Sequence, residues 1–303
     1  MLESQIGATA AYSFAHFGIK GTFDDYVWCF QRLAELGFHN FNLEILEEEH
    51  VDLFTTDRVL HFRKLGEKFG INLDIFTTYY SENDLTSMSA ERRKKGLDKF
   101  LFSVKTAKHL GSTIINMASE FPPELVDAYR PEYVHSPAGR FRIPADVSWQ
   151  SIWETHVATI RACADMAAAD GLRFSLEPRA NCLVSTTDSF LRLAEHVDRP
   201  NFGCSLDILH AHYQREDIPT AIRKLGPQLI DIQVSGADGE TMKHLPMAEG
   251  SVDYGAMVRA LDDIGFTGLV GLEIMVGDID QAYRDGRLML EQLCSKASAS
   301  VKA

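Results

Sequence analysis

The chain has 303 residues, of which 45% are hydrophobic, and this is enough apolar material for one large core or two ordinary ones. Its 43 acidic residues outnumber its 30 basic residues and give a formal net charge of −13. Such a balance argues against a nucleic-acid partner, because phosphate backbones are bound by clustered lysines and arginines. No run is long and apolar enough to span a membrane, and the first residues lack the pattern of a secretory signal.

The cysteines indicate the compartment. There are five, an odd number, and none forms a CxxC pair. This usage is typical of reduced packing thiols rather than of a disulfide framework or a zinc site. We therefore expect an intracellular protein with a cytoplasmic location.

A local pattern recurs along the chain: an amphipathic helix, often closed by a glycine, and then an apolar β-rich run that ends on polar residues. The first run is IGATAAYSF, and the later runs are, in order, NFNLE, INLDIFTTYY, STIINMASE, LRFSLEPR, NFGCSLDILH, LIDIQVSG and GLVGLEIM. Helical patterns lie between them, for example over 24–36, 90–110, 152–169 and 254–264. The glycine suits a helix C-cap, where a left-handed backbone is needed.

Strict alternation of strands and helices predicts a parallel sheet, and eight repeats predict closure into a single-domain (β/α)8 TIM barrel over residues 1–294. The competing fold is a doubly wound open sheet. That fold usually has a glycine-rich phosphate turn after its first strand, and ATAAYSFAHFG contains no GxGxxG. The small polar residues of 295–303 predict a flexible tail.

One connection breaks the alternation. The loop at 121–149, after the fourth strand, is too long for a simple connector. Its aromatic residues and arginines argue against disorder. It is either a lid over the site or an interface with a neighbouring subunit, and the sequence does not distinguish these.

Four oxygen-bearing side chains lie at the ends of four successive apolar runs in the second half of the chain: Glu177, Asp207, Gln233 and Glu273. A lone acid is costly to bury in such a strand unless it is paired or bound to a metal. Because strand ends of a barrel converge, four polar groups in matching places predict a divalent-cation site. The alternative is that they only cap the barrel with hydrogen bonds.

At these residues the chain resembles the xylose-isomerase-like TIM barrels of sugar isomerases and epimerases, a family that includes ketose 3-epimerases, inosose isomerases and 3-dehydroshikimate dehydratases. The resemblance covers nearly the whole chain and implies that Glu177, Asp207, Gln233 and Glu273 hold one metal ion. The DxxH pattern of the family matches Asp207 and His210. The stretch HLPMAEG is similar to the family's HLPPGEG and implies that His244 lies near the substrate.

The sequence departs from the family pattern at two positions. Gln233 replaces the usual histidine ligand, so the implied ligand set is all oxygen and favours Mn²⁺, with Mg²⁺ or Co²⁺ as alternatives, over Zn²⁺. In having glutamine at this position, the chain resembles the 3-dehydroshikimate dehydratase branch of the family. Gly239 stands where ketose 3-epimerases carry an arginine, which puts their way of holding a ketose in doubt.

The chemistry implied by the resemblance is proton transfer through an enediolate. Glu177 and Glu273 serve as acid and base, and His210 hydrogen-bonds a substrate hydroxyl or, alternatively, only caps a helix. Further substrate-binding candidates are His244, Arg179, Glu120 and Tyr79, although a salt bridge to a loop acid is an equal alternative for Arg179. Glu44 is a weaker pocket candidate, and Phe14 and Trp28 are candidates for an apolar wall, with core packing as the alternative for both.

The function expected is that of a divalent-metal-dependent isomerase or epimerase acting on a sugar, cyclitol or keto-sugar. No phosphate cradle follows the last two strands, so we expect a carbohydrate-like substrate without phosphate. The alternative is a lyase of the same enediolate chemistry, either 3-dehydroshikimate dehydratase-like or eliminating a group from a 3-keto-glycoside. A further alternative is a non-catalytic barrel subunit of a complex. The family leaves both a homo-oligomer and a hetero-oligomer open.

Overall fold

The structure, a computed structural model, describes residues 3–126 and 142–300. It contains eight parallel strands in the order β1-β8-β7-β6-β5-β4-β3-β2. A bridge between Ala8 and Phe41 joins β1 to the start of β2 and closes the ring. The strands are β1 (Ile6–Ala8), β2 (Leu43–Ile45), β3 (Ile75–Thr78), β4 (Ile114–Ala118), β5 (Arg173–Glu177), β6 (Phe202–Asp207), β7 (Leu229–Val234) and β8 (Leu269–Leu272). The predicted (β/α)8 TIM barrel is confirmed.

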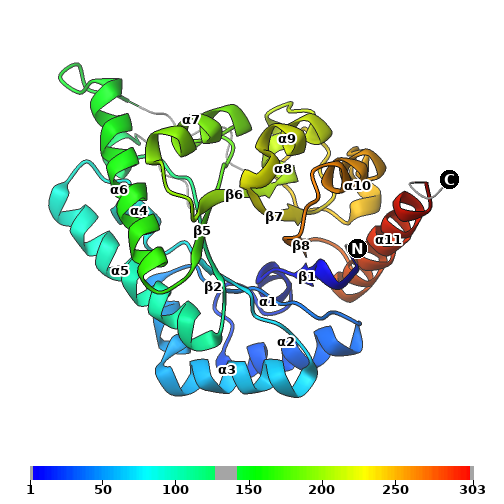
Figure 1. Cartoon of the computed structure of the whole chain (residues 1–303). Helices are drawn as coiled ribbons and strands as arrows, with labels where there is room; N and C mark the ends of the chain where they lie inside the picture. Colours follow the sequence, from blue (N-terminus) through cyan, green and yellow to red (C-terminus); the bar gives the residue numbers. More distant parts are fainter. Residues whose placement is uncertain (1–2, 127–141, 301–303) are drawn as a thin grey trace.

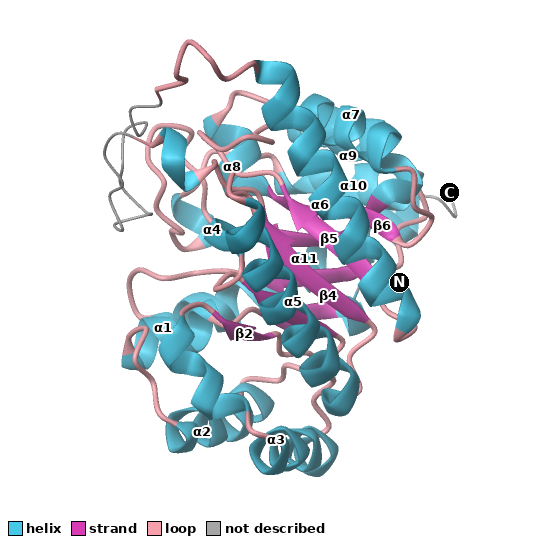
Figure 2. Ribbon diagram, turned by 90° about the vertical axis from the view of Figure 1, so that its left-hand side faces the viewer, coloured by secondary structure: helices cyan, strands magenta, loops and turns pink. Residues whose placement is uncertain are grey.

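Long helices form an outer ring around the strands (Figures 1 and 2). They are α2 (Phe23–Glu35), α3 (Thr56–Phe69), α5 (Ala90–Leu110), α6 (Trp149–Ala169), α7 (Thr187–Val197), α9 (Ile218–Leu225), α10 (Tyr254–Asp263) and α11 (Ile279–Ser300). Short helices follow three strand ends: α1 (Ala11–Phe17), α4 (Glu82–Leu85) and α8 (Ile208–Tyr213). The described residues also contain five 3-10 helices, at Glu3–Gln5, Glu48–Phe54, Pro123–Leu125, Gly226–Gln228 and Met247–Glu249.

Local signals in the sequence explain where the helices begin and end. Thr22 and Asp25 form a capping box at the start of α2, in which each side chain accepts a hydrogen bond from the backbone of the other. Gly70 and Gly111 end α3 and α5 with φ angles of 67° and 89°, a conformation that glycine adopts without steric cost. Such caps set the helix lengths and return the chain to the next strand.

The main core lies between the strands and the outer helices. It is rich in fully buried aromatic side chains, including Phe30, Phe62, Phe100, Phe174 and Phe190. Edge-to-face pairs such as Phe100–Phe174, with centroids 5.3 Å apart, occur within it. Large apolar side chains therefore hold the helices on the ring, while polar residues of the strand ends remain available for a site.

Two segments singled out in the sequence are the C-terminal tail and the long loop after β4. Helix α11 continues to Ser300, six residues into the segment expected to be a flexible tail, where the alanines and the lysine favour a helix. Most of the long loop after β4, residues 127–141, lies outside the described residues, so the choice between lid and interface stays open. Its described start is anchored, because Leu125 packs in a small cluster with Ile152 and Leu183.

Among the helices of the described residues, none combines the length and the apolar character needed to cross a membrane.

His156 on α6 gives a testable pH dependence. Its side chain is buried, and neither ring nitrogen has a hydrogen-bond partner among the described residues. Burial lowers the pKa of His156 from 6.5 to about 4. The unfolded chain therefore binds this proton more readily, so the stability is fully present above pH 6.5 and is lost as the pH falls toward 4.

We expect His156→Leu to flatten this dependence. Urea unfolding at pH 7 and pH 5 should show that the wild-type protein loses about 2 kcal/mol more than the variant over this interval. The exposed His109 on α5 supplies the control, and His109→Gln should behave as the wild type does. Equal losses in the wild type and His156→Leu would contradict the assignment.

Candidate active site

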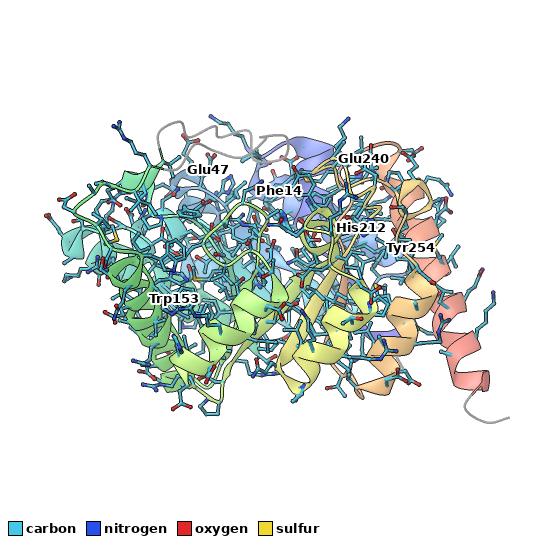
Figure 3. All side chains as sticks on the ribbon, turned by 90° about the horizontal axis from the view of Figure 1, so that it is seen from above. Phe14, Glu47, Trp153, His212, Glu240 and Tyr254 are labelled. Atoms are coloured by element: carbon cyan, nitrogen blue, oxygen red, sulfur yellow. The ribbon has the colours of Figure 1, made fainter. Side chains whose placement is uncertain are left out.

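A cavity of about 600 Å³ opens at the carboxyl ends of the strands. Its lining includes Glu177, Glu273, His210 and His244 from the second half of the barrel. Phe14 and Glu47, which follow β1 and β2, lie toward the same edge of the molecule as Glu240, which follows β7 (Figure 3). This is the face on which TIM-barrel enzymes carry their catalytic residues.

Four polar residues predicted from the sequence converge at this edge. Glu177 and Asp207 are the last residues of β5 and β6, and Gln233 pairs in register with Asp207. Glu273 directly follows β8. Glu177, Asp207 and Gln233 are almost fully buried, and the side chain of Glu273 is 19% exposed.

Their donor atoms are close enough to share an ion. One donor atom each from Glu177, Asp207 and His210 lie within 4.8 Å of one another, and the same holds for Asp207, His244 and Glu273. Asp207 belongs to both groups and so lies at the centre of the cluster. These distances suit the coordination of a single cation by donors around it.

The buried acids of the cluster would be stabilised in their ionised form by a nearby positive charge. Burial raises the pKa of Glu177, and burial together with Glu273 and Glu177 raises that of Asp207. Burial and then the neighbouring Glu177 raise the pKa of Glu273 to about 8. Within the described residues, Asp207 Oδ2 and Gln233 Oε1 have no hydrogen-bond partner. Since pairing or metal binding stabilises buried acids in their ionised form, the residues present fit a divalent cation.

A polar chain beneath the cluster orients Gln233. The Ser205 hydroxyl donates to Asp231 Oδ2 at 2.5 Å, which leaves its lone pairs free for the Gln233 amide nitrogen 3.5 Å away. The amide nitrogen of Gln233 is thereby directed to Ser205, and its oxygen is the end left without a partner. This arrangement presents oxygen rather than nitrogen as the donor.

Both predicted histidines lie beside the acids. His210 Nε2 is 3.4 Å from Glu177 Oε1 and 3.6 Å from Asp207 Oδ2. His244 Nε2 is 3.8 Å from Glu273 Oε1. Burial, followed by Arg179 and His244, lowers the pKa of His210 well below its ordinary value, which favours the neutral ring. Two nitrogen donors are therefore within reach of a cluster expected to be all oxygen.

Arg179 forms ion pairs with acidic side chains of the protein. Its Nη2 donates to Glu82 Oε2 at 2.7 Å and lies 3.6 Å from Glu120 Oε2. The ion pair that the sequence left as the alternative for Arg179 is thus present, although Arg179 also lines the cavity. The Tyr79 hydroxyl donates to Glu177 Oε2 at 2.8 Å, and the Arg179 guanidinium lies 5.2 Å from the centre of the Tyr79 ring.

Sequence reasoning missed Glu82. Its carboxylate is buried in α4 and also accepts a hydrogen bond from the Ala118 amide at 2.7 Å. The only available signal was an acid shortly after the third strand, in YYSEND, which looks like an ordinary surface turn. Of the two apolar wall candidates, Phe14 lines the cavity, whereas Trp28 packs against Phe17 with ring centroids 5.2 Å apart.

Comparison with known proteins identifies the family. Residues 30–293 match the family model described as Xylose isomerase-like TIM barrel. The chain belongs to this family. The resemblance implied by the DxxH pattern and the strand-end acids is therefore confirmed at the level of the family.

Relatives of this xylose isomerase-like barrel include sugar epimerases. The D-psicose 3-epimerase of Ruminiclostridium cellulolyticum is 24% identical over 257 residues, which cover 83% of this chain and 79% of that protein. The solved structure of an L-ribulose 3-epimerase superposes with a TM-score of 0.78 at 14% identity, covering 98% of this chain and 96% of that one. The structure of a probable 3-DHS dehydratase from Bacillus anthracis gives 0.70 at 20% identity, covering 95% and 98%. At these identities the two structures show the shared fold alone.

The polar chain beneath Gln233 leads to a prediction for metal affinity. Ser205→Ala should weaken Mn²⁺ binding by roughly 10–100-fold in calorimetric titration, because the Gln233 amide loses the acceptor that orients it. Ser103→Ala is a matched control, since Ser103 is also a buried serine but bonds Thr78 away from the cluster. Unchanged affinity in Ser205→Ala, with the fold intact by circular dichroism, would remove Ser205 from the orientation of Gln233.

Proposed function

We propose that this chain is a divalent-metal-dependent isomerase or epimerase that moves a proton on a carbon next to the carbonyl of a sugar, cyclitol or keto-sugar. The observation that carries the proposal is the pair of cavity carboxylates Glu177 and Glu273 on either side of Asp207. Glu177 ends β5 and Glu273 follows β8, three positions away around the ring. They therefore reach the cavity from different sides, as transfer between two faces of a substrate requires. The epimerase among the relatives supports this class of reaction.

In this proposal Glu177, Asp207, Gln233 and Glu273 hold one cation. A divalent cation, when bound, polarises a carbonyl and makes the neighbouring C–H more acidic. Carboxylate and amide oxygens favour Mn²⁺, with Mg²⁺ or Co²⁺ as alternatives. His210 and His244 contact substrate hydroxyls, and either could add a nitrogen donor to the metal.

The two glutamates divide the proton transfer. One removes a proton from the substrate carbon and the other returns one, either to the opposite face or to the adjacent carbon. Tyr79 holds Glu177 in place through its hydroxyl, and Arg179 in turn packs over Tyr79. Asp207, whose Oδ1 accepts from the Leu209 amide at 2.8 Å, is fixed and takes no part in proton transfer.

A lyase is the second candidate. Gln233 in place of the histidine usual in the family favours it, because the dehydratase branch has glutamine at this position. Gly239 stands where ketose 3-epimerases carry an arginine, so a ketose bound here would lack the contact with that arginine. This also favours the lyase. Arg215 lies beside Gly239 but does not line the cavity.

We also propose a cytoplasmic location. The described residues contain no disulfide bond, as expected in a reducing compartment. A small carbohydrate-like molecule is the proposed partner, and the excess of acidic residues disfavours nucleic acid.

Proton exchange in heavy water tests the reaction. The Mn²⁺-loaded protein, incubated with a panel of ketoses and keto-sugars, should incorporate deuterium into substrate and product while the carbon skeleton and oxygen count are retained. Glu177→Gln and Glu273→Gln should each reduce the exchange rate by about 10²–10⁴-fold, because each removes an acid–base group. The exposed Glu240→Gln should leave it unchanged.

The alternatives give different products. An unsaturated product that has lost water or an alcohol would assign the lyase. A protein that binds no divalent ion on elemental analysis, and exchanges no deuterium, would be the non-catalytic barrel.

A further inference from the structure

Glu44 is a cavity carboxylate that belongs to neither group of candidate metal ligands. It is the central residue of β2, pairs in register with Thr77 and is only 7% exposed. It lines the same cavity as Glu177 and Glu273. Its position on β2 places it well round the ring from Asp207 on β6.

The other buried carboxylates have their own donors. Glu82 receives hydrogen bonds from Arg179 and the Ala118 amide, Glu177 from Tyr79, and Asp207 from the Leu209 amide. No donor among the described residues bonds to Glu44. Burying a carboxyl group without a hydrogen-bond partner costs free energy whether it is ionised or neutral. A partner for Glu44 must therefore come from what fills the cavity.

The basic side chains that line the cavity are paired with acids or exposed to solvent, so they are not placed to bind an anionic ligand near Glu44. Arg179 is bound to Glu82, and Lys99 lies 2.6 Å from Glu48 and 3.1 Å from Asp84. Lys95 also lines the cavity, but it is exposed to solvent on the outer helix α5. The charges that act on Glu44 are those of the acids Glu273, Glu177 and Glu82 and, opposing them, that of Arg179, which is already paired with Glu82. A carboxylate or phosphate would be repelled there, whereas a hydroxyl donates a hydrogen bond.

We propose that Glu44 accepts hydrogen bonds from hydroxyls at the end of the substrate remote from the metal. The site then takes neutral, polyhydroxylated molecules and rejects those that carry an acid group at that end. This inference rests on the proposed function, since it assumes that Glu177 and Glu273 face the reacting carbons. It adds a specificity residue on the opposite side of the ring.

The test compares Glu44→Gln with Glu49→Gln. Glu49 is an exposed acid four residues beyond the end of β2, and its ion-pair partner among the described residues is Lys20 at the surface. With the neutral ketose that shows the fastest deuterium exchange, Glu44→Gln should lower kcat/KM by roughly 10–100-fold, the value of a hydrogen bond to a charged group. Glu49→Gln should match the wild type. Mn²⁺ affinity, measured by calorimetry, should be equal in all three proteins.

Two substrate analogues sharpen the comparison. For a ketose that lacks the terminal hydroxyls, the wild type and Glu44→Gln should have similar kcat/KM, because the group that Glu44 binds is gone. For a ketose whose terminal carbon is oxidised to a carboxylate, the wild type should have a lower kcat/KM than for the neutral ketose. In Glu44→Gln the ratio between these two kcat/KM values should be smaller.

The outcomes separate this inference from the proposed function. Deuterium exchange in the wild type with no change in Glu44→Gln overturns the role of Glu44 and leaves the reaction standing. If the metal-loaded wild type exchanges no deuterium with any ketose, the proposed function fails. Calorimetry with a neutral hexitol then decides on Glu44: weaker binding to Glu44→Gln than to the wild type supports the role, and equal binding overturns it.

Discussion

The crowding of buried carboxylates at one edge of the barrel is the constraint on which the site depends. Burial raises the pKa of Glu177, Asp207 and Glu273, and repulsion from neighbouring acids raises the pKa of Asp207 and Glu273 further. Compensating positive charge stabilises such a cluster in its ionised form. The unpartnered oxygens of Asp207 and Gln233 indicate where that charge would be bound.

Packing and polar contacts around the cluster hold it in shape at some cost in stability. The buried pair Arg179–Glu82 joins the end of β5 to α4, across 97 residues of sequence. A buried ion pair adds little net stability, since desolvation offsets its attraction, so its value here lies in position. Arg179 packs over Tyr79, and Tyr79 fixes one oxygen of Glu177. Ser205 and Asp231 act in the same way on Gln233, from inside the ring.

The cavity has two chemically different sides. The half near β5 to β8 carries the acids and histidines suited to a cation and to proton transfer, and Glu44 and the apolar Phe14 line the cavity from β2 and from α1. A sugar has both hydroxyl edges and apolar C–H faces, so this combination suits it. The site thus accounts for chemistry at one end of a substrate and recognition at the other.

Much of this could be predicted from the chain alone. Strand–helix alternation, glycine caps and strand-end acids are local patterns, and in a closed parallel barrel every strand end falls on one edge, so Glu177, Asp207, Gln233 and Glu273 were bound to meet. Side-chain partnerships were not predictable, because they join residues far apart in sequence. Only the closed ring decided that Glu82 pairs with Arg179 and that Ser205 orients the Gln233 amide. It also decided that Glu44 has no hydrogen-bond donor among the described residues. Which donor bonds to which acceptor depends on the distances between side chains in the folded protein. A local sequence pattern contains no information on these distances, so it cannot show which groups are left without a partner.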